Sequence, residues 1–165
     1  MAKTNGYCVL GVDPGLNITG YGAVRFGVSG SNIVEAGTIR TSDKAPLARR
    51  IAQIHADLVE LLAELQPDAV AVETLYAHYR HPRTSILMAH ARGAILLAAQ
   101  QAGVAIHSLP ATKVKKSLTG NGHASKRQMQ RAIQSLCRLE TPPEPPDVAD
   151  ALAIALCAGK LLRHG

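Results

Sequence analysis

Two short apolar runs that each end in a carboxylate constrain the fold of this chain most. Residues 7–13 read YCVLGVD, and residues 69–73 read AVAVE. Short apolar runs bounded by turn signals are typical of buried strands, where Asp13 and Glu73 are costly unless they are paired or bound to a cation. Because strand ends in such sheets border the crevice where ligands bind, we expect both carboxylates at a ligand site.

The segments between these two runs predict a hairpin and a helix. Residues 20–26 and 32–39 are strand-like and are separated by glycine and serine, so three consecutive antiparallel strands are expected from residue 7 onward. From Pro46 the apolar residues keep helical spacing until Pro67, which predicts an amphipathic helix.

The rest of the chain alternates helices and strands. A helix over about 84–102 and an apolar run over 104–109 complete a β-α-β unit with the second carboxylate run. Basic helical segments follow around 113–118 and 126–136, and then a proline-rich link leads into an apolar helix over 147–163.

This order of elements predicts an α/β architecture. We expect a mixed five-stranded sheet, formed by three antiparallel strands and then alternating helices and strands, with helices on both faces. The 165 residues are enough for one compact domain and too few for two substantial ones, so a single domain over residues 1–165 is predicted.

The positive charge is concentrated in one region. The chain carries 18 Lys and Arg against 12 Asp and Glu, yet residues 74–139 contain no acid at all. The basic residues there are Arg80, Arg83, Arg92, Lys113, Lys115, Lys116, Lys126, Arg127, Arg131 and Arg138. A regional excess of this kind favours a phosphate-binding face, although solvated helix surfaces are an alternative. Aromatic residues make up only 3%, which argues against a binder that stacks single-stranded bases.

Two further carboxylates open the last helix. Asp147 and Asp150 are three residues apart, which places them on one face of its first turn. The apolar residues that follow predict that this helix packs inward. Asp147 could instead be an N-cap with Asp150 in the first turn, and capping does not exclude metal binding.

Together these four carboxylates predict a metal-dependent site. Several hard oxygen ligands in a basic protein suit Mg²⁺ or Mn²⁺ bound with a substrate phosphate. The implied chemistry is phosphodiester hydrolysis, with two cations in an in-line displacement.

At this point the sequence resembles the RuvC family of Holliday-junction resolvases, whose fold is ribonuclease-H-like. The motifs that carry the resemblance are residues 10–16 (LGVDPGL), 19–22 (TGYG), 71–76 (AVETLY), 91–93 (ARG) and 147–154 (DVADALAI). They cover nearly the whole chain, in order and with family-like spacing.

The resemblance implies roles for individual residues. The family's four acidic positions correspond here to Asp13, Glu73, Asp147 and Asp150. In the family these positions bind two Mg²⁺ ions, and we expect that Mn²⁺ can replace Mg²⁺. Lys115 and Lys126 match basic positions near the scissile phosphate, and Tyr76 matches an aromatic that contacts bases at the opened crossover. Each lysine could also be a solvated surface residue, and Tyr76 an ordinary core aromatic.

The expected DNA contacts extend beyond these positions. The candidates are Tyr76, Arg80, Arg83, Lys113, Lys115, Lys116, Lys126 and Arg127. Residues 76–84 are one residue longer than the family pattern and carry unusual arginine and histidine, so the contacts of this loop with the junction depart from that pattern.

The resemblance also implies partners. The family acts in recombination and repair as a homodimer that nicks two like strands of four-way junction DNA, leaving 5′-phosphate ends, and a branch-migration helicase complex is an expected partner. We expect the helix over 84–102 to form the dimer contact. The three cysteines lack metal-binding spacing and the chain has no long uncharged run, which predicts a cytoplasmic protein with reduced thiols and no membrane segment.

Three rival functions remain on the sequence alone. An inactive junction-binding protein would keep the basic face, but all four acids are present here. An actin-like kinase or ATPase would need a second phosphate loop and a second domain, so no nucleotide cofactor is expected. Another ribonuclease-H-like nuclease, acting on RNA or on RNA–DNA hybrids, would differ in its substrate.

Overall fold

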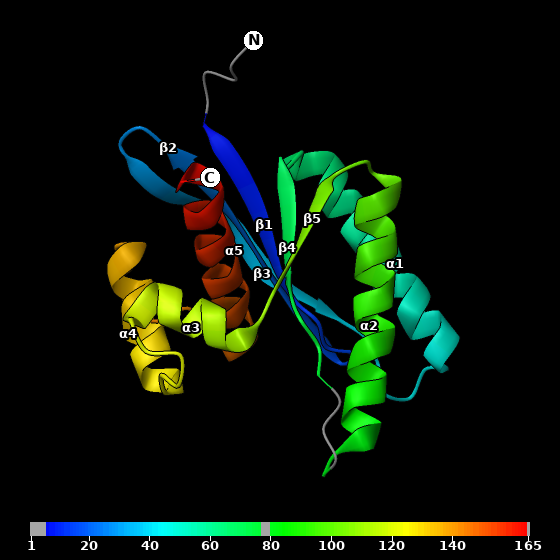
Figure 1. The fold of residues 1–165 in the computed structure, drawn as a ribbon. Helices are drawn as coiled ribbons and strands as arrows, with labels where there is room; N and C mark the ends of the chain where they lie inside the picture. The colour runs from blue at the N-terminus through cyan, green and yellow to red at the C-terminus, as the bar shows by residue number, and fades with distance from the viewer. Residues whose placement is uncertain (1–5, 77–79, 165) are drawn as a thin grey trace.

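The computed structural model describes residues 6–76 and 80–164, and it shows a five-stranded sheet between two layers of helices (Figure 1). The strands are β1 (Tyr7–Asp13), β2 (Ile18–Gly27), β3 (Gly30–Arg40), β4 (Ala69–Glu73) and β5 (Ala105–Leu109). The helices are α1 (Leu47–Leu65), α2 (Pro82–Gln101), α3 (Ala111–Thr119), α4 (Lys126–Leu136) and α5 (Pro146–His164).

The strand order β3-β2-β1-β4-β5 confirms the predicted mixed sheet. The first three strands pair antiparallel, whereas β4 runs parallel to both β1 and β5. Both β2 and β3 begin two residues earlier than expected. The strand β2 begins at Ile18 because this residue still pairs with Arg40, and β3 begins at Gly30 because pairing continues into a tight hairpin that closes at Gly27 and Gly30. Similarly, α2 begins at Pro82, where proline occupies the first turn without costing a hydrogen bond.

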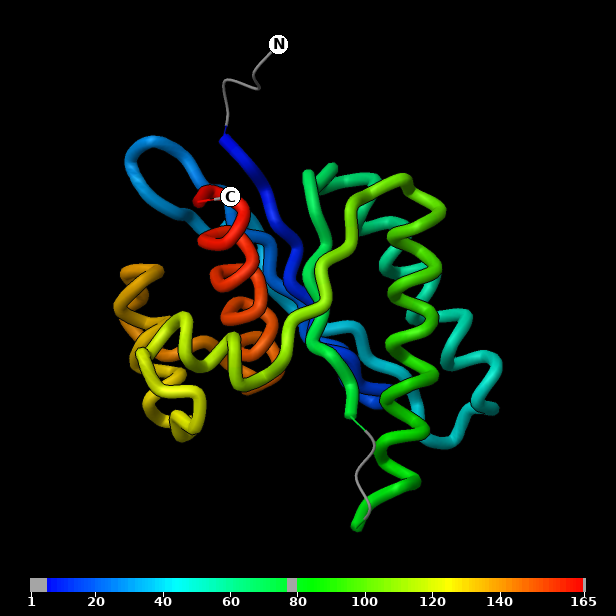
Figure 2. The backbone as a smooth tube through the Cα atoms, viewed as in Figure 1, coloured from blue at the N-terminus to red at the C-terminus, as the bar shows by residue number. Residues whose placement is uncertain are grey.

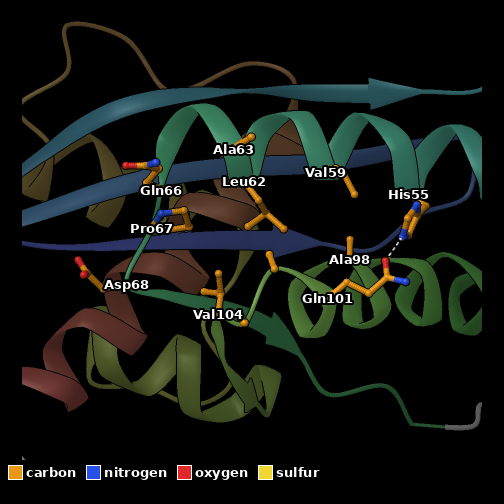
Figure 3. Close-up of a pocket in the computed structure, with 12 residues that line it drawn as sticks. His55, Val59, Leu62, Ala63, Gln66, Pro67, Asp68, Ala98, Gln101 and Val104 are labelled. Atoms are coloured by element: carbon orange, nitrogen blue, oxygen red, sulfur yellow. Dashed lines mark hydrogen bonds between the residues drawn. The ribbon is translucent and has the colours of Figure 1, made fainter.

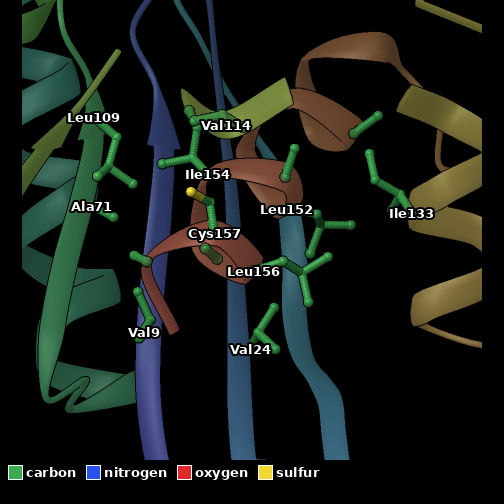
Figure 4. Packing of buried hydrophobic residues seen from close by; sticks show 14 of the residues in the cluster. Val9, Val24, Ala71, Leu109, Val114, Ile133, Leu152, Ile154, Leu156 and Cys157 are labelled. Atoms are coloured by element: carbon green, nitrogen blue, oxygen red, sulfur yellow. The ribbon is translucent and has the colours of Figure 1, made fainter. Parts of the chain in front are cut away.

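The two faces of the sheet are covered by different helices. The pair α1 and α2 packs on one face, and α5 lies on the other with α3 and α4 outside it (Figures 1 and 2). Alternation along β1 sends Leu10 and Val12 toward α1 and α2, and Val9 toward α5. On the α5 side Val9, Val24 and Ala71 face a buried row of α5 residues, Ile154, Leu156 and Cys157 among them (Figure 4).

Glycines let α5 approach the sheet closely. A Cβ atom at Gly11 would overlap the carbonyl oxygen of Ala151, and one at Gly20 would overlap that of Asp147. At Gly22 an added Cβ would lie 2.6 Å from a side-chain methyl of Leu152. The backbone of α5 therefore rests almost directly on β1 and β2 along its first half.

The structure agrees with the predicted state of the cysteines. Cys8 and Cys157 are buried and Cys137 is half-buried, and none of the three forms a disulfide bond within the part of the chain that the structure describes. Among the described residues, no helix is long and apolar enough to cross a membrane.

The close approach of α5 gives a stability prediction. The change Gly11→Ala should lower the free energy of unfolding by about 1–3 kcal/mol, because the added methyl meets helix backbone rather than a flexible side chain. Urea unfolding followed by circular dichroism measures the effect. Gly27→Ala is the matched control in a neighbouring strand, because the nearest atom to its added Cβ is 4.0 Å away. Equal losses in the two variants would contradict the packing argument.

Candidate active site

Two neighbouring strands place Asp13 and Glu73 at the same edge of the sheet. The strands β1 and β4 run parallel, and their pairing ends with Val12 opposite Val72, one residue before each carboxylate. Both acids follow Val9 and Ala71 by an even number of residues, so they lie on the α5 face. Each is half-buried.

The first turn of α5 brings Asp147 and Asp150 to the same edge. The contact of Gly20 with the carbonyl of Asp147 holds this turn against β2, and Gly20 pairs with Asp13 across the sheet. The helix begins at Pro146, so Asp147 already lies inside it. The alternative that Asp147 is the N-cap is therefore wrong, because proline at the first position moves the helix start one residue toward the N-terminus.

The four carboxylates form one electrostatic cluster. Burial is the main cause that raises the pKa of Asp13 to about 8. Three neighbouring negative charges add to that rise, in the order Asp150, Glu73 and Asp147. Burial likewise raises the pKa of Glu73, and Asp150 adds to it; burial also raises that of Asp150 itself. At neutral pH Asp13 therefore keeps its proton in the absence of metal, and a bound cation would favour its ionised form.

Lys115 and Lys126 partly offset this charge from the α5 side. Lys126 lowers the pKa values of Asp13 and Asp150, and Lys115 lowers those of Glu73 and Asp150. Both lysines line a cavity of about 210 Å³ together with Glu73 and Asp150. The structure thus brings together all six residues predicted for the chemistry.

A capping motif in the local sequence explains why α4 begins at Lys126. Ser125 caps α4, because its hydroxyl accepts a hydrogen bond of 3.2 Å from the backbone N–H of Gln128. In turn, the backbone N–H of Ser125 donates a hydrogen bond of 2.8 Å to Oε1 of Gln128. This capping box places Lys126 in the first turn, next to the carboxylates.

The loop after β1 is held by residues that the sequence analysis did not select. The hydroxyl of Thr41 donates to the carbonyl of Leu16 at 2.6 Å, and Arg50 Nε donates to the same hydroxyl at 2.8 Å. Arg50 also bonds the side chain of Asn17, and it is 9% exposed. The sequence feature that could have indicated Arg50 is its position on the apolar face of α1, between Leu47 and Ile54.

Two more hollows adjoin the carboxylates on the α2 side. One of about 360 Å³ lies between the β1–β2 loop and the first turns of α2, with Asp147 in its wall. The other, of about 20 Å³, is lined by Asp13, Glu73 and Arg92. Hollows therefore adjoin the carboxylates on both the α2 side and the α5 side.

Another cavity lies away from the carboxylates. It measures about 730 Å³ and separates the C-terminal halves of α1 and α2 (Figure 3). His55 and Gln101 bridge its rim with a hydrogen bond of 2.8 Å. Asp68 in its wall precedes β4, at the opposite end of that strand from Glu73. This cavity is therefore remote from the carboxylates.

The donor set suits a hard divalent cation. Four carboxylates supply oxygen ligands at the sheet edge, which is the chemistry that Mg²⁺ and Mn²⁺ prefer; three of them are half-buried and Asp150 is exposed. Within residues 6–76 and 80–164, no three His, Cys, Asp or Glu side chains lie close enough together to enclose an ion. The residues fit the cation by type, burial and charge, and their side chains would have to converge to bind it.

The other predicted DNA contacts are surface residues. Tyr76 is 68% exposed, so the alternative of a core aromatic is wrong. The basic candidates outside the cluster are also exposed, namely Arg80, Arg83, Lys113, Lys116 and Arg127. Part of the unusual segment over 76–84 lies outside the described residues, since these exclude 77–79.

The sequence comparisons identify the family of the chain. The family model of crossover junction endodeoxyribonuclease RuvC matches residues 9–158. The chain belongs to the RuvC family. The RuvC protein of Rhodopirellula baltica is 47% identical over 157 residues, which cover 95% of this chain and 88% of that protein. The RuvC protein of Alkaliphilus metalliredigens is 41% identical over 149 residues, or 90% of each chain.

Solved structures confirm the ribonuclease-H-like fold expected from the resemblance to RuvC. Thermus thermophilus RuvC in complex with its Holliday junction substrate superposes with a TM-score of 0.90 at 35% identity, covering 96% of both chains. The yeast mitochondrial Holliday junction resolvase shares the fold alone, with a TM-score of 0.67 at 14% identity.

The raised pKa of Asp13 predicts how stability depends on pH. The folded state keeps this proton up to about pH 8, whereas the unfolded carboxyl releases it near its usual 3.8. Stability is therefore lost progressively as the pH rises between these values. Without divalent cation, Asp13→Asn should exceed the parent protein in Tm by at least about 2–4 °C at pH 8, and by less at pH 5.

Melting curves with EDTA or Mg²⁺ check this prediction. Mg²⁺ should raise the Tm of the parent protein more than that of Asp13→Asn, because the variant lacks one ligand. Asp43→Asn, at an exposed position, is the control and should follow the parent protein. A difference in Tm that does not change with pH would contradict the role of Asp13 ionisation.

Proposed function

We propose that this chain is a divalent-cation-dependent endonuclease that resolves four-way DNA junctions by paired, symmetric nicks. The carrying observation is that Asp13, Glu73 and Asp150 lie near one another at one sheet edge, with Lys115 and Lys126 beside them. Membership of the RuvC family and the likeness to a RuvC structure with a Holliday junction support the choice of substrate.

The residues divide the work at the scissile phosphate. Asp13, Glu73, Asp147 and Asp150 would hold two Mg²⁺ ions, for which Mn²⁺ can substitute; when bound, these supply the positive charge that an in-line displacement at phosphorus needs. Lys115 and Lys126 contact the phosphate oxygens and hold the strand in place. A water oxygen forms the new bond to phosphorus and the P–O3′ bond breaks, which leaves a 3′-hydroxyl and a 5′-phosphate.

The basic surface supplies the junction contacts. Lys113, Lys116 and Arg127 lie on the exposed parts of α3 and α4 beside the catalytic lysines. Tyr76, Arg80 and Arg83 border the other side of the site, between β4 and the first turn of α2. We assign backbone contacts to the basic residues and a base contact at the crossover to Tyr76.

We assign the homodimer contact to α2. This helix is apolar on its outer side as well, because Ile86 and Leu97 are 58% and 52% exposed. His90 and Gly93 complete an exposed row with them at helical spacing. A two-fold protein presents two active sites to a two-fold junction, which paired nicking requires.

Three further predictions accompany this function. The protein acts in the cytoplasm in recombination and repair, and it works with a branch-migration helicase complex. No surface is assigned to that complex.

A substrate panel tests the proposed function. The parent protein should nick labelled four-way junctions in Mg²⁺ and leave linear duplex and RNA–DNA hybrid intact, while EDTA abolishes cutting. Asp13→Asn should bind the junction but not cut it, because the basic surface remains while a ligand is lost. Cutting of the hybrid would indicate another nuclease of this fold, and tight binding by an inactive parent protein would indicate an architectural role.

The dimer contact can be tested separately. The change Leu97→Glu should convert the dimer to a monomer in analytical ultracentrifugation, because it places charge in the exposed apolar row of α2. Leu161→Glu is the matched control, since Leu161 is 42% exposed near the end of α5. A Leu97→Glu protein that stays dimeric would contradict the assignment.

A further inference from the structure

Arg92 of α2 joins the ends of two strands beside the active site. Its Nε donates a hydrogen bond of 3.2 Å to the backbone carbonyl of Glu73, and its Nη2 donates one of 2.9 Å to the hydroxyl of Ser108. Glu73 ends β4, and Ser108 lies in the neighbouring strand β5. The guanidinium of Arg92 therefore links α2 to β4 and β5 at the end of β4, where Glu73 lies.

The carbonyl of Glu73 lies just beyond the point where β4 stops pairing with β1. Pairing between β1 and β4 ends at Val12 and Val72, so it does not include Glu73. On the other side β5 holds the chain, because the N–H of Thr74 donates to the carbonyl of Leu109 at 2.9 Å. The β1–β4 pairing does not include the carbonyl of Glu73, and Arg92 supplies the hydrogen bond to this carbonyl instead.

Arg92 also lies close to the reacting groups. It lines the small hollow that contains Asp13 and Glu73, and this hollow is on the α2 side of the carboxylates. Lys115 and Lys126 line the cavity on the opposite side, with Glu73 common to both. The main chain at Glu73 is consequently held from the face that the catalytic lysines do not reach.

We propose that Arg92 is a positioning residue, which sets the main-chain geometry of Glu73 so that its carboxylate can converge with Asp13 and Asp150 on a divalent cation. The planar guanidinium donates to two acceptors in a fixed geometry, and a lysine ammonium on its flexible stem does not. This role rests on the proposed function, because it concerns cation binding at the same site. It differs from the lysines, which contact the substrate phosphate.

The test separates cation binding from junction binding. In Arg92→Ala, the Mn²⁺ concentration for half-saturation, measured by electron paramagnetic resonance without DNA, should rise about 10- to 100-fold, with a similar fall in kcat. Junction affinity in EDTA should change by less than about threefold. Arg92→Lys should recover only part of the loss. Arg163→Ala, an exposed arginine near the end of α5, is the control and should match the parent protein.

Ser108 provides an independent variant in case Arg92→Ala folds poorly. Ser108→Ala removes one acceptor and should weaken Mn²⁺ binding, whereas Ser108→Thr keeps the hydroxyl and should restore it. Unchanged Mn²⁺ binding in Arg92→Ala, or a loss of junction affinity as large as the loss of kcat, would overturn the proposal. The Mn²⁺ measurement needs no cutting, so a parent protein that cuts no junction would refute the proposed function without deciding the role of Arg92.

Discussion

The approach of α5 to a glycine-bearing surface is the contact on which the rest of the site depends. Gly11, Gly20 and Gly22 remove the side chains that would separate the helix from β1 and β2. Only at this spacing does the first turn of α5 bring Asp147 and Asp150 to the strand ends that carry Asp13 and Glu73. Side chains at these three positions would push the helix away from the sheet and hold two of the acids away from the other two. The glycines thus act on the chemistry through packing.

That convergence has an energetic consequence. Burial is the main cause that raises the pKa values of Asp13, Glu73 and Asp150, and the negative charges of neighbouring carboxylates add to each rise. Two lysines oppose four acids, so the cluster keeps an excess of negative charge that a basic DNA-binding protein would otherwise avoid. Active sites commonly keep such local destabilisation because function needs it, and the buried layers on both faces of the sheet offset it here.

Most of the fold and the acidic cluster could be predicted because both follow from local patterns. Apolar runs that end in Asp13 and Glu73 predict strands and their edge, and the spacing of Asp147 and Asp150 predicts one helix face. The start of α5 could not be placed to the residue, since Pro146 joins the helix although it follows a proline-rich link. The roles of Arg50 and Arg92 could not be predicted, because each acts through contacts with the backbone or a loop and such contacts leave no pattern in the sequence. Arg92 did lie within a family-like motif, but the motif alone gives no partner for its guanidinium.

The two helical layers make different contributions to one site. The layer of α3, α4 and α5 brings charge, because it carries two of the four acids, both catalytic lysines and the exposed basic residues beside them. The layer of α1 and α2 brings geometry, because Arg50 holds the loop after β1 and Arg92 holds the end of β4. At this edge the two layers share the wall of one hollow, which Asp147 of α5 and Met88 of α2 both line. A site at the strand ends can therefore draw phosphate-binding charge from one face and rigid support from the other, which a site in the middle of the sheet could not.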